Sequence, residues 1–411
     1  MSTSSNIRNR SVVVAGGGPA GAVAALLLAR DGAHVTVLER GLRSAALGAG
    51  LLLQPNGLAV LYALGLRESL EAVATRSSST AVRDGRGRVL VESPVPDYGH
   101  GLDHVLALRR SHLASVLDEA LDNASGVDVH YECEVLDVDR AGFVTYTRAS
   151  HDNRLAADLV IGADGVHSSV RRRMSFASRL TATGHTYFRG ITPGTFDVAP
   201  GEYWTALGLF GCAPLGDGTT YFYGDATLSS IERAMADADA DAFRQAWISA
   251  LPALAPLLAA IESTSTLLVN HVYRVDCTSF VDRRLVVVGD AAHAMAPTLG
   301  QGANSALVDC AILVDELRRG QGIEDALAAY DRRRRPVVQR VQHDADRVAR
   351  LSSMRSGVSR ALRDRALRAS NRPRSARKRY DASLQIDPAE LRQMVGSWAE
   401  HRAVHATPAR A

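Results

Sequence analysis

The clearest structural signal in this chain is the segment SVVVAGGGPAGAVAALLLARDGAHVTVLE, residues 11–39. It begins with a β-branched run at 11–16, passes through a glycine-rich turn into an Ala/Leu-rich run at 20–30, and ends in a second β-branched run at 34–39. These pieces predict a strand, a crossover helix and a parallel strand. We therefore expect a doubly wound parallel sheet that begins near the N-terminal end of the chain.

The turn in this unit carries the pattern Gly16-x-Gly18-x-x-Gly21. Gly16 permits the tight turn, Gly18 lets the backbone approach a pyrophosphate, and Gly21 lets the helix pack closely on the sheet. Glu39 ends the second strand 18 residues after Gly21. Its carboxylate suits a ribose diol and disfavours a 2′-phosphate. The segment predicts a dinucleotide site, for NAD or for FAD, and the alternative is a glycine-rich turn beside a surface acid.

Two later segments repeat the strand signature and end in acids. The first is DLVIGADGVHSSVR at 158–171, and the second is GDAAHAMAPTLGQGANSALVD at 289–309. Asp290 follows a predicted parallel strand, where doubly wound sheets bind ligands, and it can accept hydrogen bonds from a ribityl chain. The alternative role for Asp290 is a helix N-cap, and for Asp164 a strand-ending Asp-Gly turn. Residues 297–302 predict a loop before a helix whose N-terminal N–H groups stabilise negative charge.

The middle of the chain differs in composition, because it is rich in aromatic residues. Twelve of the 22 aromatic residues fall between Tyr187 and Tyr273, in segments that alternate like antiparallel strands. The period of two places Tyr221 and Tyr223 on one face, and Tyr187 and Arg189 form a second same-face pair. These side chains either line a site for a planar aromatic substrate or pack the sheet against its covering helices.

The buried-strand pattern returns at 284–289, so a second domain interrupts the first. The expected fold class is α/β: a Rossmann-like dinucleotide-binding domain interrupted by an antiparallel-sheet substrate domain, with a helical C-terminus. Around residues 370–379 we expect a basic, mobile connection. The expected divisions are a first part of the binding domain at 1–180, with an optional substrate-domain excursion near 80–105, the substrate sheet at 181–275, the second part of the binding domain at 276–340, and the helical region at 341–411.

Charge points away from nucleic acid and anionic membranes as main partners, because 47 basic and 44 acidic residues leave only +3. Residues 351–380 carry ten basic residues and one acid, hence +9, and the rest of the chain sums to −6. The run from Arg332 to Arg335 is predicted to be a solvated helix face. Lysine occurs only as Lys378, which disfavours Schiff-base chemistry, and the excess of arginine is typical of a GC-rich bacterial genome.

The cysteine pattern and the lack of targeting signals in the sequence predict the cellular compartment and the absence of a metal site. Four scattered cysteines predict reduced, buried thiols, and no metal-binding spacing occurs in the sequence. Residues 1–10 lack the apolar core of a signal peptide, and no run of about 20 apolar residues follows. The expectation is a soluble cytoplasmic protein without a metal.

Taken in order, the three motifs resemble those of the single-component FAD-dependent aromatic hydroxylases, such as p-hydroxybenzoate, salicylate and urate hydroxylases. The resemblance covers roughly residues 11–340. In LRRSHLASVL, the family's usual arginine is matched by Arg110, while Arg109 stands where the family often has histidine. The segment GLFGCAPLGDGTTYFYG at 208–224 resembles the urate-hydroxylase-like branch.

The resemblance implies non-covalent FAD, transient reduction by NAD(P)H, and hydroxylation of a planar aromatic or heteroaromatic molecule by O₂ through a flavin C4a-hydroperoxide. It gives His293 a supporting role within the flavin-binding motif. The implied cofactor residues are Gly16, Gly18, Gly21, Glu39, Arg40, Arg110, Asp164, Gly289, Asp290, Pro297, Gly300, Gly302, Ala303 and Asn304. The catalytic residues expected are Pro297, Gly300, Tyr223 and Arg189, and the substrate residues are Tyr187, Arg189, Tyr221 and Tyr223.

Two other functions are compatible with these residues. One is a flavin-dependent oxidoreductase that inserts no oxygen, and the other is a flavin-binding regulator whose basic segment at 351–380 touches nucleic acid. The sequence leaves open the substrate, the position of hydroxylation and the choice of NADH or NADPH. The expected assembly is a monomer or homodimer.

Overall fold

A computed structural model describes residues 6–43, 49–320 and 322–396, so residues 1–5 of the N-terminal segment and residues 397–411 of the helical region lie outside this description. The glycine-rich unit opens a six-stranded sheet of order β18-β19-β12-β1-β2-β8, in which only β18 runs antiparallel to its neighbour. Its strands are β1 (Ser11–Ala15), β2 (His34–Leu38), β8 (Val127–His130), β12 (Leu159–Gly162), β18 (Val281–Asp282) and β19 (Leu285–Val287).

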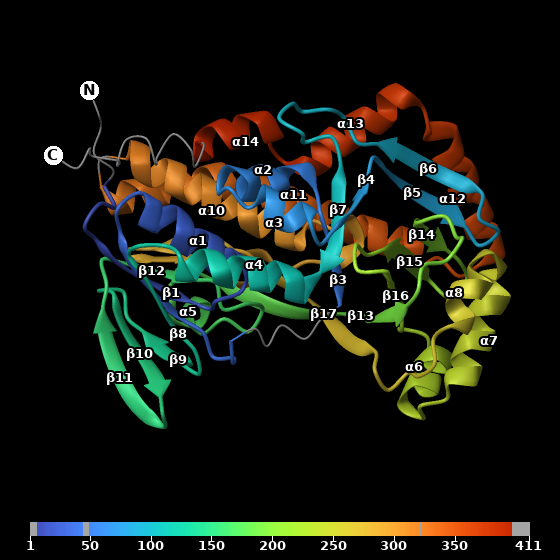
Figure 1. Ribbon diagram of the computed structural model, residues 1–411, viewed down its shortest axis with the longest axis horizontal. Coiled ribbons are helices and arrows are strands. Elements are labelled where there is room, and N and C mark those ends of the chain that lie inside the picture. Colours follow the sequence, from blue (N-terminus) through green and yellow to red (C-terminus); the bar gives the residue numbers. More distant parts are fainter. Residues whose placement is uncertain (1–5, 44–48, 321, 397–411) are drawn as a thin grey trace, which may run out of the picture.

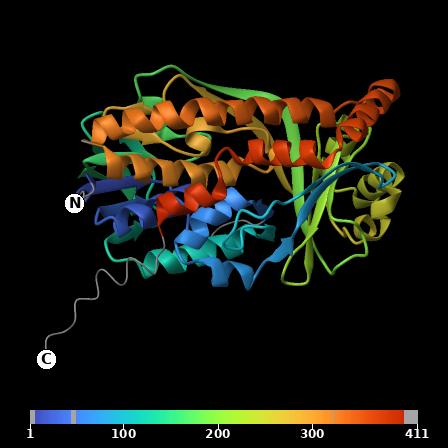
Figure 2. The same cartoon turned by 90° about the horizontal axis from the view of Figure 1, so that it is seen from above.

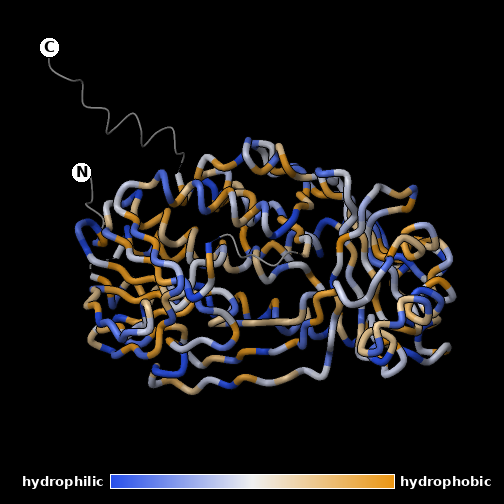
Figure 3. The backbone as a smooth tube through the Cα atoms, turned by 60° about the horizontal axis from the view of Figure 1, so that its bottom comes forward, coloured by the Kyte–Doolittle hydropathy of each residue, from blue (hydrophilic) through white to orange (hydrophobic). Residues whose placement is uncertain are grey.

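Helices cover this sheet because its strands are almost continuously apolar. Strands β12 and β19 are buried at every residue, and Figure 3 colours the hydrophobic positions of the whole backbone orange. Helix α1 packs between α10 and α4 and buries Ala22 to Leu28 without a break. The covering helices are α1 (Pro19–Arg30), α2 (Pro55–Ala63), α3 (Arg67–Glu71), α4 (Arg110–Asp122), α5 (Ser169–Arg173), α9 (Asp290–His293) and α10 (Gly302–Arg319).

A seven-stranded sheet of order β17-β13-β16-β15-β14-β5-β6 forms the other half of the molecule. Strands β5 and β6 come from residues 79–94, well before the rest of this sheet, so the chain enters it twice. Short helices pack over its outer face in Figure 1. The elements are β5 (Ser79–Asp84), β6 (Val89–Pro94), β13 (Ser178–Pro193), β14 (Gly201–Trp204), β15 (Leu209–Pro214), β16 (Thr219–Asp225), β17 (Leu268–Cys277), α6 (Ser229–Ala236), α7 (Ala240–Ala250), η1 (Pro252–Leu254) and α8 (Ala255–Ala259).

Two small sheets complete the strands. The order β3-β7-β4 joins the two halves near α4, and β11-β10-β9 projects beside the parallel sheet (Figure 1). Their strands are β3 (Gly50–Leu53), β4 (Thr75–Ser77), β7 (Val105–Arg109), β9 (Val135–Val138), β10 (Phe143–Arg148) and β11 (His151–Ala156). With this arrangement of sheets, we propose the domain boundaries expected from the sequence, at residues 180, 275 and 340.

The C-terminal region is helical, and α11 runs along much of the molecule (Figure 2). The connection predicted at 370–379 is shorter than expected, because α12 ends at Ser370 and α13 begins at Pro373. Proline suits the first turn of a helix, and Ala376, Tyr380 and Leu384 form a buried stripe at intervals of four. The helices are α11 (Ile323–Ser352), α12 (Gly357–Ser370), α13 (Pro373–Leu384) and α14 (Pro388–Val395).

The four cysteines are all buried and free, as their scattered spacing predicts. Burial raises the pKa of the Cys133, Cys212, Cys277 and Cys310 thiols. They are therefore protonated packing residues at neutral pH.

Candidate functional site

The glycine-rich turn contains two kinds of glycine. A Cβ on Gly16 would lie 2.5 Å from the Ala163 oxygen, and a Cβ on Gly21 would lie 1.9 Å from the Gly16 oxygen. Both positions therefore need glycine for packing. Gly18 instead caps α1, and a Cβ there would meet nothing within 4 Å. The open space at a helix N-terminus fits a pyrophosphate.

Glu39 lies beside this turn at the carboxyl end of β2. Its Oε2 accepts a hydrogen bond from the Gly17 N–H at 2.6 Å, and its Oε1 accepts one from the Gly41 N–H at 2.7 Å. Arg40 follows and is exposed. Each carboxylate oxygen can accept a second donor, so Glu39 can hold the turn and still bind a ribose hydroxyl.

Asp164 follows β12 at the same edge of the sheet. Its Oδ2 accepts from the Ser169 and Val170 N–H groups at 2.6 and 3.2 Å, which caps α5. Its Oδ1 is buried and has no hydrogen-bond partner among the described residues, and a Cβ on the neighbouring Gly165 would meet none of their atoms within 4 Å. A buried carboxylate oxygen needs a donor, which a bound cofactor or water would supply.

Gly289 and Asp290 lie at the end of β19. Gly289 has a φ of 59°, and a Cβ there would approach Ala306 to 3.0 Å. Asp290 begins α9 and is exposed, and its side chain forms no hydrogen bond or ion pair with the residues that the structure describes. Its carboxylate is therefore free to accept hydrogen bonds from a ligand, rather than being committed to the helix end.

The loop at 297–302 is held from three sides. Gln54 Nε2 donates to the Leu299 carbonyl at 3.0 Å, Asn304 Nδ2 donates to the Gly300 carbonyl at 2.8 Å, and Thr298 Oγ1 donates to the Ala345 carbonyl at 2.7 Å. Pro297 begins the 3₁₀ turn η2 (Pro297–Leu299), and Gly300 is left-handed at a φ of 62°. The loop is fixed by contacts within the protein.

Helix α10 starts directly after this loop. A Cβ on Gly302, its first residue, would meet no described atom within 4 Å, so there is open space beside the first turn of the helix. Ala303 is the next residue of this turn. The Asn304 side chain is fully buried and donates to Leu52 as well as Gly300, while its Oδ1 accepts from the Gln54 N–H. Asn304 therefore positions the loop, and the empty space belongs to the backbone of the first turn.

Two arginines approach each other where the two halves meet. The Arg110 pKa is lowered, first by burial and then by the Arg189 guanidinium, while Asp290 acts in the opposite direction. Within the described ranges, neither guanidinium forms a hydrogen bond or ion pair. Arg109 differs, because it pairs with Asp217 and donates to Thr219 at 3.2 Å. Asp290 therefore offsets part of the Arg110 charge, but neither arginine is paired with a carboxylate in the described ranges, which leaves net positive charge for an anionic group.

The predicted substrate residues do share one face of the seven-stranded sheet. Arg189 lies opposite Tyr223 in the register of β13 and β16, and the Tyr221 and Tyr223 rings stack with centroids 5.4 Å apart. Tyr187 belongs to a hydrophobic cluster against which both Tyr223 and Leu299 pack, so this face lies on the side of the loop at 297–302. The aromatic side chains on the opposite face belong to a closed core with α7: Phe188, Phe210, Phe222, Phe243 and Trp247.

Sequence reasoning missed Glu202 on the same wall. Its Oε1 accepts from the Tyr223 hydroxyl and its Oε2 from the Trp204 indole N–H, both at 3.1 Å. Protein surrounds this carboxyl closely enough for burial to raise its pKa, although the two donors oppose that shift. The available signal was an acid in an alternating strand, two residues before Trp204.

The arginine run at 332–335 is only in part the solvated face that was expected, because Arg332 is exposed but Arg334 is buried. Arg334 is only 1% exposed, and its Nε donates to Asp309 Oδ1 at 2.5 Å. Asp309 Oδ2 lies 2.5 Å from His293 Nε2 and accepts from the Gly289 N–H at 2.8 Å. His293 therefore has a supporting role, as the resemblance implied. Arg334 also donates to Gln385, which in turn donates to Gln301 at 3.0 Å, linking the C-terminal helices to the loop.

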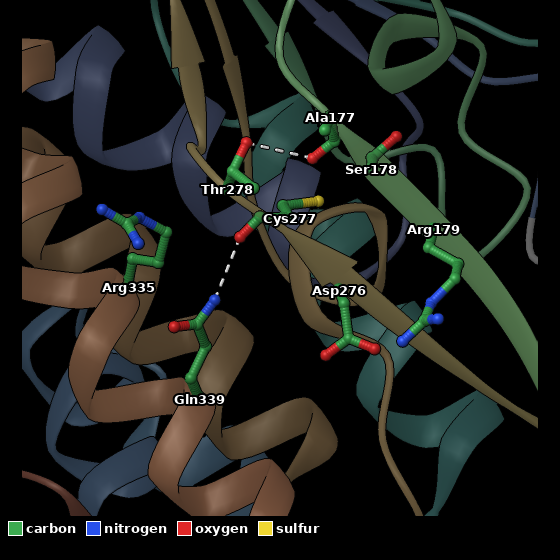
Figure 4. A pocket seen from close by; sticks show the side chains of 8 residues that line it. All are labelled: Ala177, Ser178, Arg179, Asp276, Cys277, Thr278, Arg335 and Gln339. Atoms are coloured by element: carbon green, nitrogen blue, oxygen red, sulfur yellow. Dashed lines mark hydrogen bonds between the residues drawn. The ribbon is translucent and has the colours of Figure 1, made fainter.

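A surface groove of about 470 Å³ lies between β17, β13 and α11 (Figure 4). Arg179, Asp276 and Arg335 are among its lining residues, and none of the predicted site residues lines it. This groove is therefore separate from the candidate site. Within the described residues, no three His, Cys, Asp or Glu side chains are grouped to hold a metal, and no helix is long and apolar enough to cross a membrane.

Comparisons with known proteins agree with this geometry. A 3-amino-4-hydroxybenzoate 2-monooxygenase of Streptomyces cremeus is 31% identical over 389 residues, which covers 89% of this chain and 93% of that protein. A 2-heptyl-3-hydroxy-4(1H)-quinolone synthase of Mycobacteroides abscessus is 28% identical over 370 residues, covering 88% and 95%. The solved tetrameric form of 2-methyl-3-hydroxypyridine-5-carboxylic acid oxygenase is 26% identical, with a TM-score of 0.73 over 93% of this chain and 98% of the other.

The family described as FAD binding domain matches residues 9–345. This match includes the glycine-rich turn, Asp164, Asp290 and the loop at 297–302, whose open surfaces fit a bound flavin dinucleotide. With these relatives, the match shows that the protein is an oxidoreductase whose cofactor is FAD. The chain belongs to the family of FAD-dependent aromatic monooxygenases.

Proposed function

We propose that the enzyme uses NAD(P)H and O₂ to hydroxylate a planar aromatic or heteroaromatic small molecule that lies against the Tyr221–Tyr223 wall. The observation that carries this proposal is the position of that wall opposite the loop at 297–302 and the open first turn of α10. The names of the relatives support it, since those proteins act on aminohydroxybenzoate, quinolone and hydroxypyridine compounds.

Several residues would hold FAD in this site. The turn at Gly16 and Gly18 would take the pyrophosphate, Glu39 the ribose, and Asp290 the ribityl chain. Bound FAD would supply the redox chemistry that accepts electrons from NAD(P)H and activates O₂. The N-terminal N–H groups of α10 would then stabilise negative charge on the reduced cofactor.

The substrate wall would orient the aromatic ring. Tyr221 and Tyr223 offer ring faces for stacking. Arg189 would hold a carboxylate or phenolate, with the Arg110 charge nearby strengthening the attraction to an anion. An ionised phenol is richer in electrons, so this positive charge would also favour the reactive form of a phenolic substrate.

Apolar side chains would limit water near the reacting atoms. Trp204, Leu209 and Val272 surround Tyr187, while Ala345 and Ala349 of α11 close the same cluster. Excluding water would direct activated oxygen to the substrate rather than to release as hydrogen peroxide. The C-terminal helical region thereby contributes to the site from outside the parallel sheet.

We also retain the expectations of a cytoplasmic monomer or homodimer, with no nucleic acid as a partner. Size-exclusion chromatography with light scattering would measure the assembly, and the solved relative noted above is a tetramer.

Labelled oxygen tests the activity directly. Purified enzyme is screened with aromatic acids, phenols, quinolones and purines for stimulated NAD(P)H oxidation, and the product formed under ¹⁸O₂ is analysed by mass spectrometry. One labelled oxygen atom per product supports the monooxygenase. An altered product without label would identify an oxidoreductase that inserts no oxygen, and flavin binding without stimulated oxidation would favour the regulator.

A further inference from the structure

Four residues form a straight row across the seven-stranded sheet. Arg189 lies opposite Tyr223, Tyr223 lies opposite Gly211, and Gly211 lies opposite Glu202. Directly opposed residues point to the same face. Three strand spacings separate the ends of this row, so the Arg189 and Glu202 backbones are roughly 14 Å apart.

Gly211 lets Tyr223 lie flat along this row. A Cβ at Gly211 would fall 2.2 Å from Cζ of Tyr223 and 2.5 Å from its hydroxyl, so the phenol ring crosses β15 where no side chain stands. The Tyr223 hydroxyl then reaches Glu202 on the next strand at 3.1 Å. The row therefore has an aromatic floor with a guanidinium at one end and a carboxyl at the other.

Neither end of the row is electrically compensated. Across the described part of the chain, Glu202 forms no ion pair and is held only by the neutral donors Trp204 and Tyr223. Tyr187, 2% exposed, adds a buried hydroxyl that has no hydrogen-bond partner in the described ranges. Burial raises the Tyr187 pKa most, and the charges of Asp225 and Glu202 raise it further. Glu202 is half-buried, so a polar group of a ligand can reach its carboxyl and complete contacts that the protein leaves without a cation.

From this row we infer that Glu202 selects substrates bearing an amino or hydroxyl donor, while Arg189 binds an acidic group at the other end of the same ring system. The inference rests on the proposed function and narrows its substrate class to aromatic acids with a distal hydrogen-bond donor. Glu202 would accept the donor through an oxygen that already receives one protein hydrogen bond, since each carboxylate oxygen can accept two. Tyr223 would support both the ring and the carboxyl.

Equilibrium binding to the oxidised FAD-containing enzyme, without NAD(P)H, tests this selection. The probes are 4-aminobenzoate, 4-methylbenzoate and 4-methylaniline, with 6-amino- and 6-methyl-2-naphthoate as the longer pair. Dissociation constants come from flavin absorbance changes and from calorimetry. The wild type is expected to bind each amino-substituted aromatic acid about tenfold or more tightly than its methyl-substituted counterpart, as a hydrogen bond to a charged acceptor allows.

Glu202→Gln should reduce that preference to within about threefold, because an amide is a weaker, uncharged acceptor. Glu202→Leu should abolish it, and Arg189→Gln should remove the preference for 4-aminobenzoate over 4-methylaniline. Tyr203→Phe is the matched control, since Tyr203 lies on the opposite face of β14 and its hydroxyl donates to Ala199. That variant should keep the wild-type preference.

The inference would be overturned if both Glu202 variants kept the wild-type preference for the amino-substituted acids over the methyl-substituted acids. It would also be overturned if neither 4-aminobenzoate nor 6-amino-2-naphthoate bound the wild type at about 10 mM, a concentration above the weakest specific affinities. Binding is measured without turnover, so its result is separate from the ¹⁸O₂ experiment. If the enzyme forms labelled product but the Glu202 variants keep the wild-type preference, only the selection by Glu202 is contradicted. A preference that responds to Glu202 without any labelled product would instead contradict the monooxygenase activity.

Discussion

The two faces of the seven-stranded sheet use the same strands for different purposes. On one face, Phe188 and Phe222 are 0% and 1% exposed and pack against Trp247 under α7. On the other, Tyr223 and Arg189 are only partly buried; the Tyr223 hydroxyl donates to Glu202 along the sheet, and the Arg189 charge acts on Arg110 of the cofactor half. Neighbouring residues thus separate stability from ligand binding. The same division distinguishes Asp309 from Asp290 and Gly21 from Gly18.

The buried member of the aspartate pair should show the largest effect. Asp309→Ala leaves Arg334 buried without its carboxylate, and breaking a buried ion pair from one side costs about 3–5 kcal/mol. Urea unfolding of the FAD-free proteins measures this loss. A stability within about 0.5 kcal/mol of the wild type would show that the Asp309 network does not hold the fold.

The stabilising effect of the Asp309 carboxylate should also appear in the pH dependence of the unfolding free energy. The Asp309 pKa is lowered: burial would raise it, but His293 and Arg334 outweigh that effect. A carboxyl with a depressed folded pKa stabilises the protein above its unfolded pKa and loses that contribution as the pH falls through the folded value. Unfolding free energy should therefore decline below about pH 4, with a flatter decline in Asp309→Asn. Identical slopes would contradict the assignment.

Phe222→Ala should come next among the stability effects. Removing a fully buried aromatic ring costs about 3–5 kcal/mol, and Phe222 is stacked on Phe210 at 6.1 Å within the closed face. Thermal unfolding with a denaturant series measures the change. If Phe222→Ala were as stable as Tyr223→Phe, the two faces would not differ as described.

The exposed member of the aspartate pair should act on the cofactor instead. Asp290→Ala removes a ligand acceptor that has no partner within the described protein, and a lost charge-assisted hydrogen bond weakens FAD binding by about 1.5–3 kcal/mol. Fluorescence titration of apoprotein with FAD measures this affinity. Stability of the FAD-free variant should stay at the wild-type value, and an unaltered FAD affinity would remove Asp290 from the site.

The glycines offer a sharper version of this contrast. Gly21→Ala places a Cβ 1.9 Å from the Gly16 oxygen, so it should destabilise the apoprotein by about 1–3 kcal/mol. Gly18→Val points into open space and should leave the apoprotein folded but unable to retain flavin, because the side chain blocks the pyrophosphate. Full flavin content in purified Gly18→Val would count against this position for the cofactor.

Local signals explain why the parallel half was predictable. The β-branched runs, the glycine spacing and the helix predicted after the loop at 297–302 each lie within a short window of sequence, and that helix is α10. Arg334 shows the limit of local reading. Its charge suggested solvent, but its partner Asp309 lies 25 residues away and becomes a neighbour only through the packing of α10 on α11.

The sequence predicted which residues of one strand share a face of the substrate wall, but not which residues of neighbouring strands lie side by side. Period two placed Tyr221 and Tyr223 together, as the structure has them. Glu202 joins Tyr223 only through the register of β14, β15 and β16, which a single sequence does not specify. The basic run at 370–379 was misjudged because charge obscured the buried stripe of Ala376, Tyr380 and Leu384.

The most direct test of the account is the coupling of oxidation to hydroxylation in Tyr223→Phe. The variant should keep its FAD and its stability within about 1 kcal/mol, because only one hydroxyl is lost from the open face. Once a substrate is found, product formed per NAD(P)H consumed is measured beside hydrogen peroxide release. We predict lower product yield and more peroxide than in the wild type, since a misplaced ring receives less of the activated oxygen. Unchanged coupling together with an unchanged KM would contradict the assignment of this face to the substrate.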